Sequence, residues 1–208
     1  MTDRLIASSE APVVVGLGST GLSCVRYYSA RGIPCVVADS RAEPPGLEQL
    51  HAIDPELHVQ PLEADVLKRA GRLVVSPGVA LDQPAVAAAI EAGVSVCGDI
   101  DLFCEEANAP VVGITGSNGK STVTALLGEM VAAAGQRVAV GGNLGTPALD
   151  LLDESVALYV LELSSFQLER AGKLGLALAT VLNLSPDHLD RHRSMQAYHA
   201  AKHRIFLN

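Results

Sequence analysis

The sequence predicts an α/β protein built from two parallel sheets. Short runs rich in β-branched residues alternate with helical patterns, and the alternation starts twice, at Val13 and again at Val111. Each start leads through a glycine-rich turn into a helix. Strand, helix and strand at this spacing are typical of βαβ units, whose strands run parallel. The acidic stretch Asp99–Pro110 separates the two alternations, so we expect one domain over residues 1–108 and another over residues 109–208.

The first domain should contain three strands and two helices. Its strand-like segments are VVVGLG, CVVAD and RLVVSPG, and helical patterns follow the first and the last of them. In chain order these elements are expected at Val13–Gly18, Thr20–Arg31, Cys35–Asp39, Arg72–Gly78 and Pro84–Ala92.

The second domain should contain four strands, an early helix and a late one. The early helix has apolar residues at helical spacing, which predicts that this face docks on the sheet. The face consists of Val123, Leu126, Leu127, Met130 and Ala134. The strands are expected at Val111–Thr115, Arg137–Val140, Ala157–Leu163 and Leu178–Leu184, with the early helix ending near Gly135 and the late one at Ser194–Leu207.

Composition and charge exclude several classes of protein. The net charge of −8 argues against general nucleic-acid binding, which needs cations to neutralise phosphates. No apolar run reaches the roughly 18 residues of a membrane span, and the opening MTDRLIASSE lacks the pattern of a signal peptide. The four cysteines have no CxxC spacing, so we read them as reduced thiols. We therefore expect a cytoplasmic protein that contacts neither membrane nor nucleic acid, and we expect it to be a monomer.

The first glycine turn has the pattern G-x-G-x-x-G at Gly16, Gly18 and Gly21. Glycines at these positions let the backbone approach a pyrophosphate, which the helix N-terminus attracts. Asp39 ends the next expected strand, where its carboxylate could accept hydrogen bonds from a ribose or a base. The pattern indicates a Rossmann-like nucleotide-binding domain. On its own it suits a nicotinamide or flavin nucleotide, or a turn that only packs helix on strand.

The second glycine turn, GITGSNGKST, is similar to a phosphate-binding P-loop. It departs from the Walker pattern by one residue, because Ile114 stands where that pattern has its first glycine. The chemistry still transfers, since glycines expose amides, Lys120 neutralises phosphate charge and Ser121 can ligate magnesium. The sequence thus predicts a P-loop-type mononucleotide-binding domain for ATP and magnesium. Its nucleotide-binding residues are expected to be Gly116, Ser117, Asn118, Gly119, Lys120, Ser121 and Thr122.

The whole chain resembles the Mur ligases, and within that family the member that adds D-glutamate. The resemblance lies in GLGSTGLS, ADSR, SPG, GITGSNGKST, GGNLGTPAL, LELSSFQLE, LNLSPDHLDRH and YHAAKHRI. It implies that ATP phosphorylates the alanyl carboxylate of UDP-N-acetylmuramoyl-L-alanine, and that the amine of D-glutamate then attacks the acyl phosphate. Amide, ADP and phosphate would be the products.

The resemblance also implies roles for individual residues. For the UDP-sugar it implies Ser19 and Thr20 at the diphosphate, Asp39 and Ser40 at the uracil, and Ser76 and Gly78 as further contacts. For the muramoyl-alanine end it implies Asn143, Ser164 and Gln167. The catalytic residues would be Lys120, His188 and Lys202. The magnesium ligands would be Ser121, Glu162, His188 and a carbamate on Lys202.

Family members continue beyond the point where this chain stops, so we expect it to hold the amino-terminal and a truncated central region. Such a piece should bind the UDP-sugar without completing the reaction. Two alternatives stay open: a non-catalytic module that binds a UDP-sugar or another nucleotide, and an NAD-dependent oxidoreductase.

Four histidines, His188, His192, His199 and His203, raise the question of a zinc site. On a helical wheel His199 and His203 fall outside the apolar stripe of the last helix, and arginines flank His192. We therefore reject zinc and keep only His188 as functional. Lys202 lies within the same stripe, where a lysine either snorkels to solvent or carries a function.

Overall fold

The computed structural model describes residues 11–207. The first ten residues, from which we argued against a signal peptide, lie outside that range, as does Asn208. The chain divides into two compact units, Met1–Cys97 and Gly98–Asn208. The predicted boundary after residue 108 falls later in the chain. No helix within residues 11–207 is long and apolar enough to cross a membrane.

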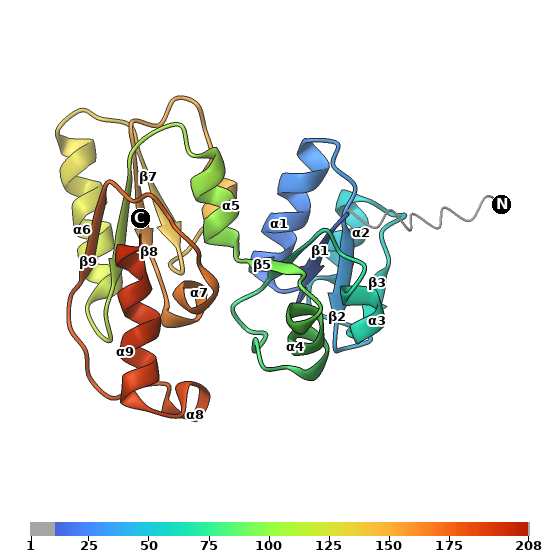
Figure 1. The fold of residues 1–208 in the computed structure, drawn as a ribbon. Helices are drawn as coiled ribbons and strands as arrows, with labels where there is room; N and C mark the ends of the chain where they lie inside the picture. The colour runs from blue at the N-terminus through green and yellow to red at the C-terminus, as the bar shows by residue number, and fades with distance from the viewer. Residues whose placement is uncertain (1–10, 208) are drawn as a thin grey trace. The chain divides into compact units, whose positions relative to one another are not determined.

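The first unit is a five-stranded parallel sheet with the order β3-β2-β1-β4-β5 (Figure 1). Its strands are β1 (Pro12–Val15), β2 (Val36–Asp39), β3 (Val59–Pro61), β4 (Arg72–Val75) and β5 (Ser95–Cys97). Its helices are α1 (Ser19–Ala30), α2 (Leu47–Ile53), α3 (Ala64–Leu67) and α4 (Pro84–Glu91). Strands β3 and β5 were not predicted, because three residues are too few to show a period.

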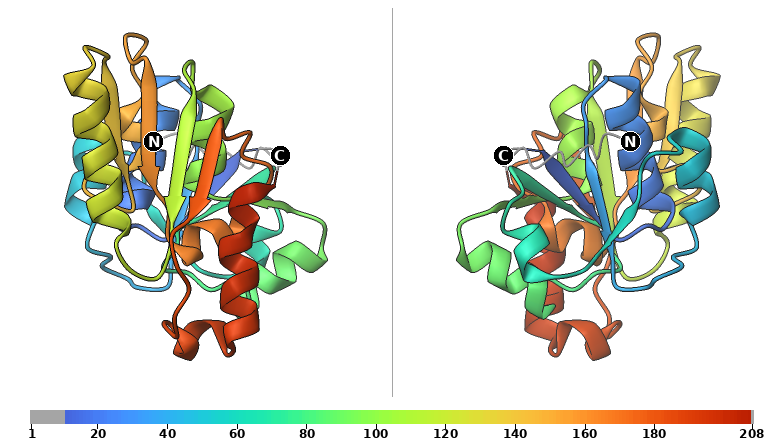
Figure 2. Two further views of the ribbon diagram at one scale, coloured as in Figure 1. Left: turned by 90° about the vertical axis from the view of Figure 1, so that its left-hand side faces the viewer. Right: turned by 90° about the vertical axis from the view of Figure 1, so that its right-hand side faces the viewer.

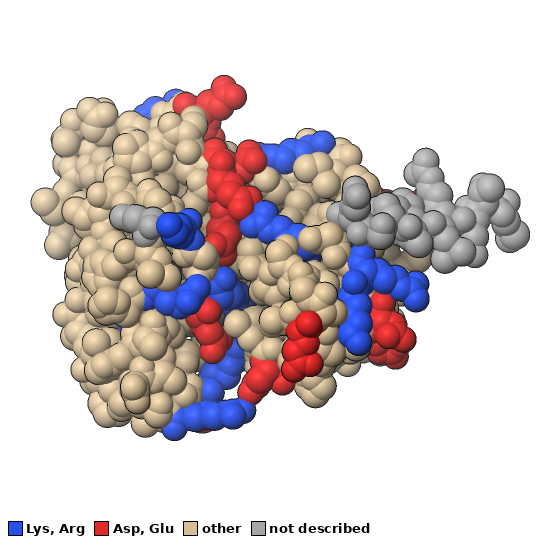
Figure 3. Space-filling model, viewed as in Figure 1, with Lys and Arg blue, Asp and Glu red and all other residues tan. Residues whose placement is uncertain are grey.

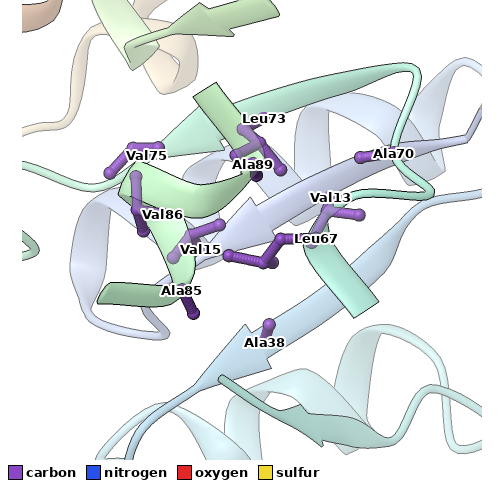
Figure 4. Close-up of a cluster of buried hydrophobic side chains, with 10 residues drawn as sticks. All are labelled: Val13, Val15, Ala38, Leu67, Ala70, Leu73, Val75, Ala85, Val86 and Ala89. Atoms are coloured by element: carbon purple, nitrogen blue, oxygen red, sulfur yellow. The ribbon is translucent and has the colours of Figure 1, made fainter. Parts of the chain in front are cut away.

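Valine, leucine and alanine side chains form the core of this unit. Figure 4 shows Val13 and Val15 of β1 in one cluster with Leu73 and Val75 of β4 and the helix residue Val86. All of these side chains are buried. Strands covered on both faces need apolar residues at successive positions, and the run PVVV of β1 meets that need.

The second unit is a four-stranded parallel sheet with the order β7-β8-β6-β9. Its strands are β6 (Val111–Thr115), β7 (Val138–Gly142), β8 (Leu158–Glu162) and β9 (Leu178–Val181). Its helices are α5 (Asp99–Glu106), α6 (Lys120–Ala133), α7 (Ser165–Arg170), α8 (Leu189–His192) and α9 (Met195–His203), with 3₁₀ turns η1 (Ala148–Leu151) and η2 (Arg204–Phe206). Figure 2 shows α6 and α9 on opposite sides of this sheet. The two parallel sheets confirm the predicted α/β class.

The acidic segment that we interpreted as a boundary is helix α5. The carboxylate of Asp101 accepts a hydrogen bond from the Gly98 amide at 2.7 Å, which satisfies a donor at the start of the helix. Phe103 is fully buried and packs edge-on against Tyr159 of β8, with ring centroids 5.0 Å apart. An acidic first turn suits the positive end of a helix, so the acidity of this segment is compatible with a packed element.

The expectation for the docking face of α6 was wrong except for Leu127, which packs against the core cluster of the second sheet. Leu126 and Met130 are 57% and 60% exposed, whereas Thr124 and Gly128 are buried. A Cβ atom at Gly128 would lie 2.5 Å from Cγ2 of Val140, so the helix backbone sits directly against β7. Apolar spacing gave the wrong rotation because this close approach requires small residues on the docked face.

The described surface carries charges of both signs. Figure 3 shows Lys and Arg interspersed with Asp and Glu, without an extended basic area in this view.

We expect Gly128→Val to lower the free energy of unfolding by about 1–3 kcal/mol, the usual effect of overpacking. The added side chain would force α6 away from Val140. The matched control is Ala125→Val, which places the same side chain at an exposed position of the helix. Chemical denaturation should show a loss well below 1 kcal/mol for this control. Equal losses in the two variants would contradict the close packing.

Candidate nucleotide and phosphate sites

The first glycine turn depends on two of its glycines. Gly16 has a φ of +91°, in the region that favours glycine. A Cβ atom on Gly21 would collide with the carbonyl oxygen of Gly16. The Oγ atom of Ser76, which follows β4, donates to that same carbonyl at 2.9 Å. The turn therefore brings the start of α1 close to the carboxyl ends of β1 and β4.

A cavity of about 360 Å³ lies beside this turn. It is lined by residues from the ends of the central strands and from the loops that follow them. All six residues of this unit that were expected to bind substrate are among them: Ser19, Thr20, Asp39, Ser40, Ser76 and Gly78. Ligands of open parallel sheets bind at this edge, so the cavity is the candidate nucleotide site of the first unit.

The carboxylate of Asp39 already has partners on both oxygens. Oδ2 accepts from the Leu17 amide and from Nη2 of Arg41, both at 2.8 Å. Oδ1 accepts from the amide and from Nε of Arg41, both at 2.9 Å. These bonds, first of all those from the guanidinium group, lower the pKa of Asp39 to about 2. Its expected contact with a uracil stays a prediction, and Arg41 is a lining residue that the sequence analysis did not single out.

The second glycine turn joins β6 to α6 as a phosphate-binding loop does. Gly119 has a φ of +81° and precedes the first residue of the helix. Nζ of Lys120 donates to the carbonyl oxygens of Gly116 and Ser117, at 3.0 and 3.1 Å. These two bonds tie the Lys120 side chain to the backbone of the loop that precedes it. A phosphate group would offer the ammonium a stronger, charge-assisted acceptor than these carbonyls.

Glu162, at the end of β8, lies beside this loop. It is only 2% exposed. Its Oε2 accepts from Oγ of Ser121 and its Oε1 from Nδ2 of Asn143, each at 2.6 Å. Asn143 follows β7, and its backbone N–H also donates to the backbone carbonyl of Glu162 at 2.8 Å. A buried carboxylate held by a hydroxyl and an amide offers the hard oxygen ligands that magnesium prefers.

Three residues that we had not assigned hold the loop from the other side. Oδ1 of Asn183 accepts from the Asn118 amide, and Nδ2 of Asn183 donates to the Asn118 carbonyl, both at 2.9 Å. The Ser185 amide donates to Oγ of Ser117 at 2.9 Å, and the Tyr198 hydroxyl lies 3.0 Å from the same oxygen. Asn183 and Ser185 follow β9, the neighbour of β6 in the sheet, and that strand order was the missing signal.

Lys202 of α9 is buried, with 2% of its surface exposed. Its Nζ donates to Oγ1 of Thr115 at 3.2 Å and to the Gly116 carbonyl at 2.9 Å. It also lies 4.8 Å from the centre of the Tyr198 ring. Burial, and then the charge of Lys120, lowers the pKa of Lys202 to about 8. The amine thus points at the phosphate loop, and a stem that snorkels to solvent is excluded.

His199 and His203 are exposed, as their positions on the helical wheel indicated. His192 is buried, lies 3.0 Å from Oγ of Ser165 and stacks on Phe166, with centroids 5.3 Å apart. No group of three His, Cys, Asp or Glu side chains that could hold a metal occurs within residues 11–207.

His188 is half exposed and adopts a φ of 51°. Its Nε2 lies 3.5 Å from Oδ2 of Asp187, and its ring packs against Phe166. No direct contact joins His188 to Glu162 within the described part of the chain. The assignment of His188 as a metal ligand therefore stays a prediction.

Ser164 and Gln167 lie at the start of α7. Ser164 caps the helix, since its Oγ accepts from the Gln167 amide at 3.2 Å. Gln167 is buried, although the resemblance placed it against the substrate. Both roles stay predictions.

We expect Asp39→Asn to lower the melting temperature of the chain at neutral pH. The folded pKa of Asp39, about 2, lies below the ordinary value of 3.8, so the carboxylate stabilises the folded state at higher pH. This stabilisation should disappear as the pH falls from 3.8 through about 2, where wild type and variant should converge. Glu43→Gln, at an exposed position of the same unit, is the control. A difference between Asp39→Asn and wild type that does not depend on pH would contradict the ion pair.

Each half of the chain matches a domain of known proteins. Residues 10–98 match the family described as Mur ligase MurD-like, N-terminal domain, and residues 114–208 match the Mur ligase middle domain. The UDP-N-acetylmuramoylalanine–D-glutamate ligase of Pseudomonas fluorescens is 58% identical over 204 residues, which cover 97% of this chain and 46% of that protein. The enzyme of the same name from Marinobacter nauticus is 55% identical, with the same coverage. The chain thus spans about half the length of the curated relatives that it matches.

Two solved structures share the fold. A murein peptide ligase from Psychrobacter arcticus has a TM-score of 0.54 at 18% identity, over 92% of this chain and 46% of that one. The UDP-N-acetylmuramate-alanine ligase MurC from Thermotoga maritima has a TM-score of 0.54 at 20% identity, over 94% of this chain and 46% of that one. The two matched domains, the phosphate loop beside Glu162 and the identity to curated relatives lead to one conclusion: the chain belongs to the Mur ligase family.

Proposed function

We propose that this chain forms the UDP-sugar-binding and phosphate-binding part of an ATP-dependent ligase that joins D-glutamate to UDP-N-acetylmuramoyl-L-alanine. The relatives with 55–58% identity carry the name of that activity. The product is an intermediate of peptidoglycan synthesis. ATP and UDP-sugars are soluble nucleotides, and the four cysteines form no disulfide within residues 11–207, so we place the protein in the cytoplasm. We also propose that it is a monomer.

The observation that carries the proposal is the arrangement around the phosphate loop. Lys120 and Ser121 begin α6, directly after the loop that follows β6, and Glu162 ends β8, the paired neighbour of β6. A cation for phosphate, a hydroxyl and a buried carboxylate therefore meet at one edge of the sheet. This set suits phosphoryl transfer, which depends mainly on positioning and on charge stabilisation.

The loop would first bind the phosphates of ATP. The amides of Ser117 and Asn118 already donate to Asn183. The phosphate oxygens would accept from the amides of residues 119–122 at the start of α6 and from Lys120, which would leave the carbonyls that it now contacts. The alanyl carboxylate then attacks the γ-phosphorus and releases ADP. The amine of D-glutamate attacks the acyl carbon, and the phosphate leaves from the tetrahedral intermediate as the amide forms.

Magnesium would bring two anionic reactants together by neutralising their charge. Ser121 and Glu162 fit such an ion, because their oxygens lie 2.6 Å apart and the carboxylate is buried without a basic partner within the described residues. Asn143 orients this carboxylate through Oε1. His188 is the further ligand that the resemblance implies.

Lys202 would serve as a carbamate. Its lowered pKa leaves a part of the amine neutral near pH 8, and a neutral amine adds to carbon dioxide with loss of one proton. The product carries a negative charge and two oxygen acceptors beside the Gly116 carbonyl. In that form the side chain can bind a hard cation, which the positively charged ammonium would repel.

We expect the 208-residue chain to bind UDP-N-acetylmuramoyl-L-alanine and magnesium-ATP, measured by calorimetry. Lys120→Ala should weaken ATP about 10- to 100-fold, the effect of losing a charge-assisted hydrogen bond. It should leave the UDP-sugar unaffected. Lys173→Ala, at an exposed position of the same unit, is the control. Tight NAD binding without a response to uridine nucleotides would instead support an oxidoreductase.

We expect the chain to show a carbamate signal in ¹³C nuclear magnetic resonance after incubation with ¹³C-bicarbonate above pH 8. Lys202→Arg should remove this signal, because the guanidinium group stays charged. Lys173→Arg should keep it. A spectrum that is the same for wild type and Lys202→Arg would rule out carbamylation of Lys202.

A further inference from the structure

Asp99 is a buried carboxylate that the proposed reaction does not use. It stands at the first position of α5 and is 2% exposed. Its Oδ2 accepts from Nε2 of Gln167 at 3.2 Å, whereas Oδ1 has no hydrogen-bond partner within residues 11–207. A buried polar atom without a partner is unfavourable, so its presence in a packed unit calls for a functional reason.

The groups that face Asp99 are Gln167 and Arg170 of α7, with Asp101 on its own helix. Burial raises the pKa of Asp99 to about 6, which leaves the carboxylate as the main form at neutral pH. Asp101 has a different task. Its oxygens accept from the amides of Gly98 and Gly172, at 2.7 and 2.6 Å, and so tie the start of α5 to the end of α7. Asp99 is not needed for that connection.

Asp99 fixes the orientation of the Gln167 amide. A carboxylate only accepts hydrogen bonds, so the group of Gln167 that faces it must be Nε2. The other end of the amide, Oε1, faces the backbone N–H of Ser164 at 3.1 Å, which only donates. Both contacts demand the same orientation, and Gln167 is held at both ends inside the unit.

This orientation fixes the hydroxyl of Ser164 in turn. Oε1 of Gln167 is an acceptor, so Oγ of Ser164, 3.1 Å away, must donate its proton inward. One lone pair of Oγ takes the Gln167 amide N–H at 3.2 Å. The remaining lone pair is available, and Ser164 is only half buried. Ser164 is therefore prepared to accept a hydrogen bond from a ligand.

We propose that Asp99 is a positioning residue which, through Gln167, sets Ser164 as a hydrogen-bond acceptor for the amide N–H or a hydroxyl of the muramoyl-alanine substrate. The inference rests on the proposed function. It moves Gln167 from substrate contact to support, because its side-chain oxygen and one of its amide hydrogens have partners inside the unit. The three residues form a chain of fixed polarity that runs from Asp99 through Gln167 to Ser164.

The test compares UDP-N-acetylmuramoyl-L-alanine with UDP in calorimetric titrations of the 208-residue chain at neutral pH. Asp99→Asn keeps the shape but can present either an oxygen or an N–H to Nε2 of Gln167, so the amide is then held only at its Ser164 end. We expect about three- to tenfold weaker binding of the full substrate, the effect of one lost hydrogen bond. UDP alone should bind as tightly as to wild type. Glu129→Gln, on the exposed face of α6, should change neither affinity.

A double-mutant cycle separates positioning from general damage. Ser164→Ala should also weaken the full substrate, and Asp99→Asn should have no further effect in that background, since the acceptor is already gone. Asp99→Asn removes a buried charge, so its melting temperature should match or exceed that of wild type. A purely structural Asp99 would lower the melting temperature and would affect UDP and the full substrate equally.

The outcomes distinguish this inference from the proposed function. If wild type binds the full substrate and Asp99→Asn binds it equally well, the positioning role is overturned and the function stands. The role is also overturned if Asp99→Asn weakens binding as much in the Ser164→Ala background as in wild type. If wild type does not bind the full substrate, the proposed function fails and this inference fails with it.

Discussion

The candidate catalytic site of the second unit depends on the pairing of β6 with β8 on one side and β9 on the other. Parallel strands end at the same edge of the sheet, so this pairing sets the phosphate loop between Glu162 and Asn183. Glu162 then reaches Ser121, and Asn183 holds Asn118 by two hydrogen bonds. Residues more than 40 positions apart in the sequence become direct contacts through one strand order.

Backbone carbonyls, and not carboxylates, hold the two lysines at this edge. The Gly116 carbonyl accepts from both Lys120 and Lys202. Two ammonium groups near one carbonyl repel each other, and this repulsion adds to burial in lowering the pKa of Lys202. The ammonium of Lys120 thus lies at the loop in contact with backbone carbonyls, from which it can turn to an anionic ligand.

Two buried carboxylates, Asp39 and Asp99, have different hydrogen-bonding surroundings. Asp39 is saturated by N–H donors and its pKa is lowered, whereas Asp99 has one oxygen without a partner within the described residues and its pKa is raised. Hydrogen bonds to the charged form explain the first shift, and desolvation explains the second. A carboxylate with hydrogen-bond donors on both oxygens, such as Asp39, holds its loop in place. A carboxylate with a single donor, such as Asp99, keeps a strong preference for that donor, which is the property that a positioning residue needs.

The sequence by itself determined the features that depend on neighbours along the chain. Both glycine turns, the strands on either side of them and the place of Lys202 on the apolar stripe of the last helix were predicted, because residue type and period carry that information. The family motifs also identified residues that line the cavity of the first unit.

Only the tertiary structure decided which groups meet. The rotation of α6 follows from the close approach of Gly128 to Val140, whereas period alone favoured a face that includes the exposed Leu126 and Met130. The hydrogen bonds from Asn183, Ser185 and Tyr198 to the phosphate loop follow from strand order and from the placement of α9. The commitment of Gln167 to Asp99 joins residues 68 positions apart. Hydrogen bonds and close packing are short-ranged in space, so a linear pattern cannot specify them until the sheet has brought their partners together.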